Sequence, residues 1–518
     1  MSITSPASFW QQWFSSERRQ DWIAVVTLLV VGGFLRLWDL AQIPCGLFPD
    51  QANHGLDAVL LSQGLVLPVY GGDEGLFVYL VAIVQFFFGT GIWQVILTSA
   101  LVGTATLAST YLAVKVVFNR KLAFLTAFIL AVSSWHIALS RDGFRAILVP
   151  LIVTLFIFVL TKALQAKSAQ QQFLLYPLAA GLFALGFYTY YAYVIFALLI
   201  GLFGLITLVI KHKTVFPQLW KSKRAVILAL LAFLVVIAPI ALYVMLYPEE
   251  YFSRVGQVSI FAQSHNLWDR ITVLYQNMKA TVVGAFTTGD LNWRHNASGS
   301  PFLPLLLAPF FIVGLGSALY QRGKYLFALA IMIAMCAPAI MTNDGLPPHG
   351  LRLIGTIPFV FLFAAIPLTW LLNLKGKVSK WVGHVLVVVI LTAISWQGYQ
   401  NYFGQAPYQA HYYYDYRCDL TALTSHLKTT NSYHIVADDF SFDTIKYLML
   451  PQSVVHETPE HFLQNFNQSY VQAHPQIILA TAFGKFDQRV IDILSKDYEA
   501  KLFPNKFDRG DYYVFISK

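Results

Sequence analysis

The chain has 518 residues, of which 57% are apolar and only 12% are charged, and its mean hydropathy is +0.58. This composition excludes an ordinary soluble domain and predicts a helical protein that crosses a membrane several times. The net charge of +9 would suggest a nucleic-acid partner in a soluble protein, but the lysines and arginines lie in short loops beside hydrophobic runs. Cytoplasmic loops of membrane proteins carry this pattern. The charge therefore indicates topology, and no nucleic-acid partner is expected.

The first hydrophobic run, residues 22–38, is long enough to span a membrane, and no small-residue cleavage site follows it. We interpret it as an uncleaved signal anchor in the plasma (inner) membrane, with the N-terminus in the cytoplasm. The three cysteines of the chain exclude a fold built on disulfides. Cys45 and Cys418 could pair in an oxidising compartment, but the sequence gives no distance between them, so a bridge is not expected.

The first outer loop, residues 41–90, is predicted to hold two short helices at the membrane interface. Pro49 suits a first helical turn and Gly64 a left-handed stop, which predicts a helix over residues 50–63. The three-and-four spacing gives this helix an apolar face and an opposite polar face, made of Asp50, Asn53, His54 and Asp57. Residues 76–88 are apolar but too short to cross a core of about 30 Å, so a second helix is predicted to lie along the membrane.

The later hydrophobic runs bring the expected number of crossings to about eleven. They cover residues 92–117, 122–139, 146–166, 173–188, 190–210, 225–247, 302–320, 325–342, 351–373 and 379–398. This count places every basic loop in the cytoplasm, whereas a crossing at residues 76–88 would place Arg120 and Lys121 outside. The predicted fold class is therefore a polytopic α-helical membrane protein.

The same count gathers a second set of ionisable residues on the outer face. The set contains Asp50, Asp57, Asp73 and Glu74 of the first outer loop and the segments 140–145, 289–296 and 343–352. Ionisable groups at membrane depth are costly, so several of them on one side indicate a functional cavity.

Residues 405–518 differ from the transmembrane region, residues 1–404, because they have ordinary polarity and no spanning run. Strands are predicted at residues 434–438, 477–481 and 512–517, and helices at 415–428, 441–449 and 486–494. We expect a small extracytoplasmic α/β domain.

Asp50 is the first candidate for chemistry, because a carboxylate at a helix start beside the membrane can act as a general base for an incoming hydroxyl. Helix capping is an equally good explanation of its position. Glu74 and Asp142 are the next candidate bases, although Asp73 and Glu74 also fit a capping role. His54, on the same helix face as Asp50, is a candidate for substrate binding.

Several basic side chains are candidates for holding a phosphate. Arg141 and Arg145 are four residues apart, and paired guanidiniums bind phosphate with charge-assisted bonds; the alternative is that they anchor helix ends at the membrane surface. Arg294 and His295 lie in an outer loop, residues 248–301, of about 54 residues, a length typical of a lid or acceptor-binding element. His349 and Arg352 at the next outer turn could extend the site or simply be solvated.

Several motifs are missing. The sequence has no CxxC, HExxH, Walker A or GxSxG pattern, which removes the main support for structural zinc, metalloprotease, nucleotide-binding and hydrolase functions. The aromatic run at residues 187–193 is more typical of an outer aromatic belt than of a sugar-stacking platform.

A series of short motifs follows in order over about residues 20–375. They are RLWDL, P-x-GLFPDQA-x-x-G-x-DA, G-x-x-GLFVYL, NRK, SSWHIALSRDGFRA, NWRHN and HGLRLIG-x-x-P. This ordered series resembles the GT-C membrane glycosyltransferases, and within them the protein O-mannosyltransferase and aminoarabinose transferase branch.

The resemblance implies transfer of a sugar from a polyprenyl-phosphate carrier, held among membrane lipids, to a lipid, glycan or protein acceptor on the outer face, as in protein glycosylation at the cell envelope. It also implies that Asp50 is the catalytic carboxylate. The family's second acid is replaced by Gln51, which weakens a metal role for this pair. We assign no metal ligands, and a divalent cation is the only cofactor left open.

Two other function classes compete with the transferase. A transporter or flippase of lipid-linked sugars would also have polar residues in a multi-span bundle, although transporters favour midplane sites and repeated halves. A non-catalytic partner in glycan assembly is the third class, since Gln51 would then mark a decayed site.

Overall fold

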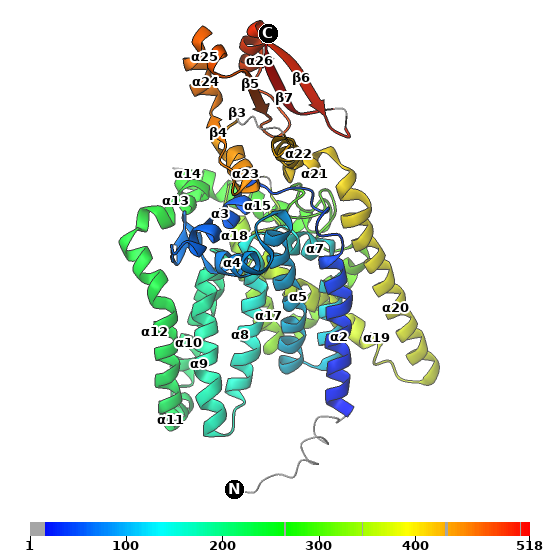
Figure 1. Cartoon of the computed structure of the whole chain (residues 1–518). Coiled ribbons are helices and arrows are strands. Elements are labelled where there is room, and N and C mark those ends of the chain that lie inside the picture. Colours follow the sequence, from blue (N-terminus) through cyan, green and yellow to red (C-terminus); the bar gives the residue numbers. More distant parts are fainter. Residues whose placement is uncertain (1–15, 264–265, 344, 346, 430–433, 508) are drawn as a thin grey trace.

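The computed structural model describes residues 16–263, 266–343, 345, 347–429, 434–507 and 509–518. A bundle of long helices fills most of the structure, and a five-stranded sheet with its own helices stands on one end of the bundle (Figure 1). We call this end of the bundle the sheet end.

The bundle helices correspond to the predicted hydrophobic runs, and the runs 122–139 and 325–342 are each divided between two helices. They are α2 (Ser16–Leu37), α5 (Ile92–Val117), α6 (Arg120–Val132), α7 (Ser134–Ser140), α8 (Leu148–Leu164), α9 (Ala169–Leu185), α10 (Ala192–Ile210), α12 (Lys223–Leu246), α16 (Ala308–Gln321), α17 (Lys324–Ala334), α18 (Ala337–Ile340), α19 (Ile357–Leu371) and α20 (Lys377–Tyr399). Among the described residues, seven helices are long and apolar enough to cross a membrane, or eight if the bent pair α6 and α7 is one span. The chain is therefore a multi-span membrane protein, and eleven crossings stay a prediction.

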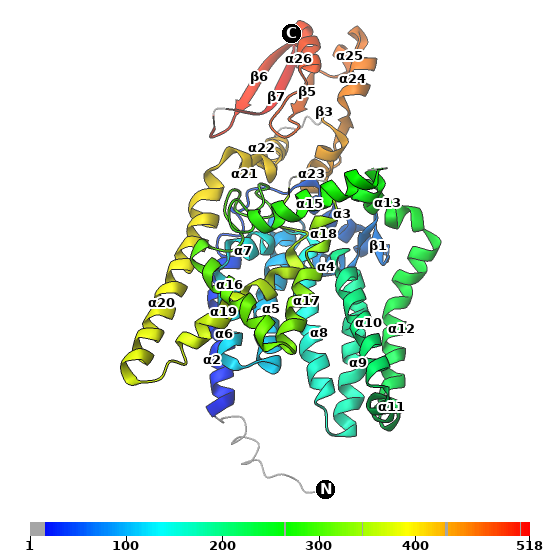
Figure 2. The same cartoon turned by 180° about the vertical axis from the view of Figure 1, so that it is seen from behind.

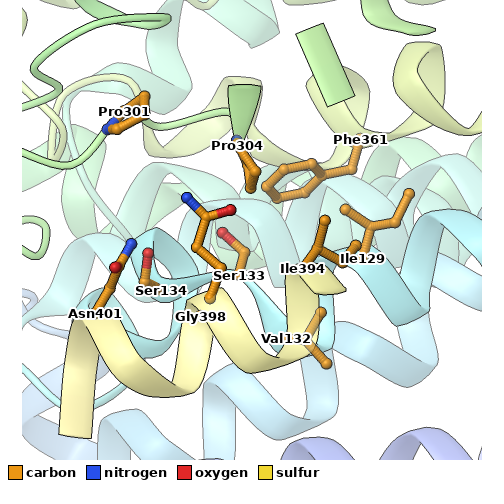
Figure 3. Close-up of a pocket in the computed structure, with 11 residues that line it drawn as sticks. Ile129, Val132, Ser133, Ser134, Pro301, Pro304, Phe361, Ile394, Gly398 and Asn401 are labelled. Atoms are coloured by element: carbon orange, nitrogen blue, oxygen red, sulfur yellow. The ribbon is translucent and has the colours of Figure 1, made fainter. Parts of the chain in front are cut away.

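The pair α6 and α7 is bent by 66° at Ser133, whose backbone is extended. Figure 3 shows a small cavity beside this break, lined by Ser133, Ser134, Phe361 of α19 and Ile394 of α20. Its volume of about 10 Å³ is close to the space that one water molecule needs. The bend brings the turn after α7, which carries Asp142, to the sheet end.

Shorter helices cover the two ends of the bundle. At the sheet end lie α3 (Pro49–Ser62), α4 (Leu76–Phe88), α13 (Pro248–Val258), α14 (Ile260–Gln263) and α15 (Leu267–Gly284), as Figures 1 and 2 show. The basic helix α11 (His212–Lys221) lies at the opposite end. The structure thus separates the sheet from this basic segment, as the charge pattern predicts.

The sheet has the strand order β4-β3-β5-β7-β6. Its strands are β3 (His434–Val436), β4 (Val455–Glu457), β5 (Gln476–Ala480), β6 (Tyr498–Pro504) and β7 (Gly510–Ser517). β4, β3 and β5 run parallel, and β7 pairs antiparallel with both β5 and β6. The helices of this region are α21 (Ala410–Asp415), α22 (Cys418–Leu427), α23 (Asp439–Met449), α24 (Pro459–Asn465), α25 (Gln468–Ala473) and α26 (Gln488–Asp497). The three predicted strands are present, and the domain boundary at residue 405 stays a prediction.

Helix α3 lies between the bundle and α23, which corrects its predicted orientation. The His54 side chain, on the predicted polar face, is 1% exposed and packs against Phe77 and Phe144, with ring centroids 5.3 and 5.5 Å away. Leu60, on the predicted apolar face, is exposed. The prediction fails at His54 and Leu60 because a second layer of protein covers this helix, whereas Asp50, Asn53 and Asp57 stay partly exposed.

Two close backbone contacts join the C-terminal region to the first loop. A Cβ at Gly55 would lie 2.5 Å from the Tyr447 ring, and the Tyr447 hydroxyl donates to the Gly91 carbonyl at 3.0 Å. A Cβ at Gly46 would lie 2.4 Å from the carbonyl oxygen of Tyr416. Only glycine fits these positions without a shift of the neighbouring chain.

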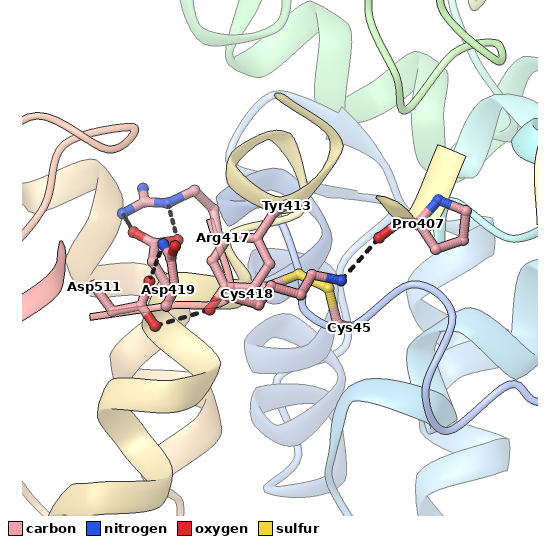
Figure 4. The surroundings of a disulfide bond; sticks show 9 residues. Cys45, Pro407, Tyr413, Arg417, Cys418, Asp419 and Asp511 are labelled. Carbon is pink, nitrogen blue, oxygen red and sulfur yellow. Dashed lines mark hydrogen bonds and ion pairs between the residues drawn. A yellow bond between two sulfur atoms is a disulfide. The ribbon is translucent and has the colours of Figure 1, made fainter. Parts of the chain in front are cut away.

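A disulfide between Cys45 and Cys418 fastens the same junction (Figure 4). Beside it, the buried Arg417 guanidinium donates to Asp419, to the Ser441 hydroxyl and to the Thr481 carbonyl. The expectation that these cysteines stay unpaired is wrong, because the fold brings together residues that are 373 positions apart.

We predict that Cys45→Ser lowers the free energy of unfolding by about 2–5 kcal/mol, because the bridge closes a very long loop. Thermal unfolding in detergent, with a thiol count under denaturing conditions, measures the effect. The matched control is Cys336→Ser, which removes a free cysteine. An unchanged melting temperature in Cys45→Ser would contradict the prediction.

We predict that Asp57 lowers the stability of the protein as the pH rises toward 7, because burial raises the pKa of its carboxyl to about 7, with the carboxylates of Asp73 and Asp443 adding to the rise. The folded state holds this proton more tightly than the unfolded state, so the loss of stability runs from about pH 4 to pH 7. Between pH 5 and pH 8, the free energy of unfolding should fall less in Asp57→Asn than in wild type, by at least about 1 kcal/mol.

Melting curves of wild type, Asp57→Asn and the exposed control Asp439→Asn at both pH values provide the measurement. An Asp57→Asn curve parallel to the wild type would refute this assignment.

Candidate functional site

The site is built on the start of the first loop, which a buried arginine holds in place. Arg141 is 0% exposed, and its guanidinium donates to the carbonyls of Arg36 at 2.9 Å and Asp39 at 3.4 Å. It also donates to the carbonyls of Leu35 and Ile43. The bonds to Leu35 and Arg36 satisfy carbonyl groups that have no helical partner because α2 ends at Leu37. The structure therefore gives Arg141 a role in holding the loop, with its Nη1 and Nη2 groups directed at backbone oxygens.

Asp50 lies in the first turn of α3 and is partly exposed. Within the described part of the chain, no hydrogen bond or ion pair engages its carboxylate. The neighbouring Gln51 is buried; its amide oxygen accepts from the Phe48 backbone N–H at 2.6 Å, and its amide nitrogen donates to Asp142 Oδ1 at 2.5 Å. Gln51, which replaces the family's second acid, thus connects the start of α3 to the turn after α7.

Asp142 is buried next to charges from two other segments. Burial raises the pKa of its carboxyl to about 6. Positive charge on Arg294 and His295 opposes this rise, and the negative charge of Asp50 adds to it. Asp142 Oδ2 is buried without a hydrogen-bond partner among the described residues. Asp50, Asp142 and the NWRHN segment are therefore close enough to interact.

A second cluster surrounds Arg145 at the start of α8. Its guanidinium lies 2.9 Å from Glu74 Oε2 and 2.6 Å from Asp73 Oδ1. Burial raises the pKa of the nearby Tyr190 hydroxyl, while Arg352 and Arg145 oppose the rise. Arg352 also donates to the Thr342 hydroxyl at 2.5 Å. Arg145 and Arg352, predicted separately, thus meet around a tyrosine of the aromatic run.

His54 occupies a buried position beside this cluster. Burial lowers the pKa of its imidazole, and the positive charge of Arg145 adds to the fall. Its Nε2 has no hydrogen-bond partner among the described residues. The side chain packs against the rings of Phe77 and Phe144.

His295 and His349 meet at one carboxylate. His295 Nδ1 lies 3.0 Å and His349 Nδ1 lies 4.0 Å from Asp290 Oδ2, and the two imidazole rings stack with centroids 4.7 Å apart. The long loop (residues 248–301) and the turn with the sequence HGLR (residues 349–352) are therefore joined at one buried carboxylate, and His295 lies close enough to Asp142 to affect its pKa.

Three phenylalanines form a wall next to Asp50 that the sequence analysis did not identify. Phe48 lies 5.3 Å from Phe440 and 5.9 Å from Phe483 between ring centroids, and the Arg294 guanidinium lies 3.4 Å from the Phe48 centroid. Phe440 and Phe483 are 40% and 43% exposed. Phe483 has a φ of +53°, a costly conformation for a bulky residue. No local pattern marks these residues, because the wall exists only where the C-terminal region meets the first loop.

The comparisons with known proteins agree with this architecture. Residues 76–243 match the family model described as dolichyl-phosphate-mannose-protein mannosyltransferase. No curated protein matches the chain by sequence. A crystal structure of ArnT from Cupriavidus metallidurans bound to undecaprenyl phosphate superposes with a TM-score of 0.60 at 13% identity, covering 95% of this chain and 97% of that one.

The archaeal oligosaccharyltransferase AglB from Archaeoglobus fulgidus, in complex with an inhibitory peptide and a dolichol-phosphate, superposes with a TM-score of 0.53 at 13% identity. That match covers 97% of this chain and 74% of the other. The chain thus has the fold of these membrane glycosyltransferases and matches the mannosyltransferase family model over residues 76–243, which confirms the resemblance to the GT-C glycosyltransferases that the ordered motifs predicted.

Proposed function

We propose that the protein is an inverting glycosyltransferase that moves a sugar from a polyprenyl-phosphate carrier to a lipid, glycan or protein acceptor. We place the reaction at the sheet end, on the outer face of the membrane. The observation that carries the proposal is the free, partly exposed carboxylate of Asp50 at the start of α3, beside buried charges and an aromatic wall. The similarity to structures with bound polyprenyl or dolichol phosphate supports the donor class.

Asp50 is the base in this proposal because the other two candidate carboxylates are engaged. Glu74 is bound by Arg145 at 2.9 Å, and Asp142 is buried and accepts from Gln51. A free carboxylate within hydrogen-bond reach of an acceptor hydroxyl can take its proton as the sugar is transferred. Attack from the side opposite the phosphate then gives inversion.

The lipid phosphate gains negative charge as the sugar leaves, so cations near it stabilise the transition state. We assign this role to Arg352, assisted by the Tyr190 hydroxyl; we give Arg145 a positioning role, because its guanidinium is bound to Glu74 and Asp73. The electrostatic coupling of Tyr190 to both arginines supports their common location. We give Arg141 a positioning role, because its Nη1 and Nη2 groups already bind backbone carbonyls.

We place the acceptor along the wall of Phe48, Phe440 and Phe483. Exposed aromatic rings offer flat apolar contact to the C–H face of a sugar or to an acyl chain. The wall begins two residues before Asp50, which would bring a hydroxyl of the bound acceptor to the proposed base.

The two competing functions have less support. A flippase would use a midplane site, whereas the charged clusters described above lie at the sheet end. A non-catalytic partner would need no free carboxylate, and Gln51 has a structural explanation in its bond to Asp142.

We predict that Asp50→Asn lowers the transfer rate by at least about 100-fold, since general-base catalysis contributes this much or more. Membranes containing wild type or variant are incubated with a labelled polyprenyl-phosphate sugar, and acceptor label and donor binding are both measured. Donor binding should persist because the change is nearly isosteric.

Asp439→Asn, an exposed aspartate of α23, is the matched control and should transfer at the wild-type rate. Equal transfer by Asp50→Asn and wild type would exclude Asp50 as the base.

A further inference from the structure

We propose that Asp290, His295 and His349 bind a divalent cation of the zinc type, and that this cation joins the long loop to the HGLR turn beside the active site. The inference goes beyond the glycosyltransferase proposal, since it concerns metal binding by the chain whatever reaction it performs. The three residues come from segments on either side of α16, α17 and α18, so only the fold brings them together.

The distances suit a single ion. One ligand atom of each residue lies within 4.8 Å of the other two. Two atoms that bind the same tetrahedral zinc at about 2.0–2.1 Å lie about 3.3 Å apart. The observed separations from Asp290 Oδ2, 3.0 Å to His295 Nδ1 and 4.0 Å to His349 Nδ1, lie on either side of this value. Small side-chain shifts would therefore complete the coordination.

Burial favours a ligand at this place. The side chains of Asp290, His295 and His349 are 5%, 6% and 16% exposed. His349 Nδ1 is buried without a hydrogen-bond partner among the described residues, and an unsatisfied buried polar atom costs about 1–3 kcal/mol. A bound cation would satisfy this nitrogen.

The carboxylate is already oriented by backbone groups. Asp290 Oδ1 accepts from the Asn292 N–H at 2.8 Å, and Oδ2 accepts from the Gly350 N–H at 2.6 Å. Such bonds to a ligand's own oxygens are typical of metal sites, because they fix the direction of the ligand. They also hold the long loop against the HGLR turn before any ion binds.

The donor set indicates which cation fits. Two imidazoles and one carboxylate match three-residue zinc sites, which leave a fourth position open, whereas magnesium and calcium prefer oxygen ligands throughout. His295 follows Arg294, which lies over Phe48 of the wall. The cation would thus fix the position of Arg294 near the acceptor, and we assign the three ligands a positioning role.

The test measures metal content directly. Wild-type protein is purified in detergent through a tag without histidine, loaded with zinc, freed of excess ion by desalting, and analysed by mass spectrometry for zinc per chain. We expect about one zinc per wild-type chain and a melting temperature that falls on chelation and recovers when zinc is added. Asp290→Asn and His349→Gln should each reduce bound zinc at least fivefold.

The matched control is His384→Gln, which removes an exposed histidine of α20 and should keep its zinc. Because wild-type binding and its melting response are measured without any variant, misfolding of a variant does not decide the result. Wild type with less than about 0.1 zinc per chain and no response to chelator, or ligand variants that keep their zinc, would overturn the proposal. Transfer activity is not needed, so failure of the glycosyltransferase assignment is a separate outcome.

Discussion

The position of the start of the first outer loop depends on one buried guanidinium. Arg141 has no contact with solvent, and it donates to backbone carbonyls at the end of α2 and in the residues that follow. In a low-dielectric interior, each bond to a charged group is worth about 1.5–3 kcal/mol. Loss of this side chain would leave several carbonyls unsatisfied at the point where the chain turns toward Cys45 and Asp50, so the start of the first loop depends on it.

The C-terminal region also holds the first loop in place. The disulfide at Cys45, the Tyr447 ring over Gly55 and the bond from Asn53 to Asp443 at 3.1 Å all act on residues close to Asp50. The glycines of the motif P-x-GLFPDQA-x-x-G are therefore explained by close approach of another segment. A loop held from both sides keeps a carboxylate in place without burying it.

The sequence allowed the helices to be predicted but gave little information on their partners. Residues 76–88 and 92–117 form helices with the expected bounds, because length and hydropathy are local properties. The convergence of the polar segments at the sheet end followed from counting crossings. The disulfide, the role of Arg141 and the burial of His54 could not be predicted, because each depends on a partner far away in the chain.

Gln51 shows why a departure from a family motif need not mean lost activity. Its amide donates to Asp142 Oδ1, and a glutamate there would bring a second carboxylate against one whose pKa is already raised by burial. Like charges at that distance destabilise each other. The amide therefore suits a site whose buried acid comes from the turn after α7.

With Asp142 bonded to Gln51, Glu74 bound by Arg145 and Asp290 held by His295 and Gly350, the neighbouring carboxylates are engaged. Asp50 differs from them because its carboxylate has no such bond among the described residues. A general base must exchange one partner for another during each turnover, and a carboxylate already committed to an arginine or a backbone amide would first have to break that bond. In the proposed reaction, the same network that stabilises the fold therefore leaves Asp50 as the acid available for chemistry.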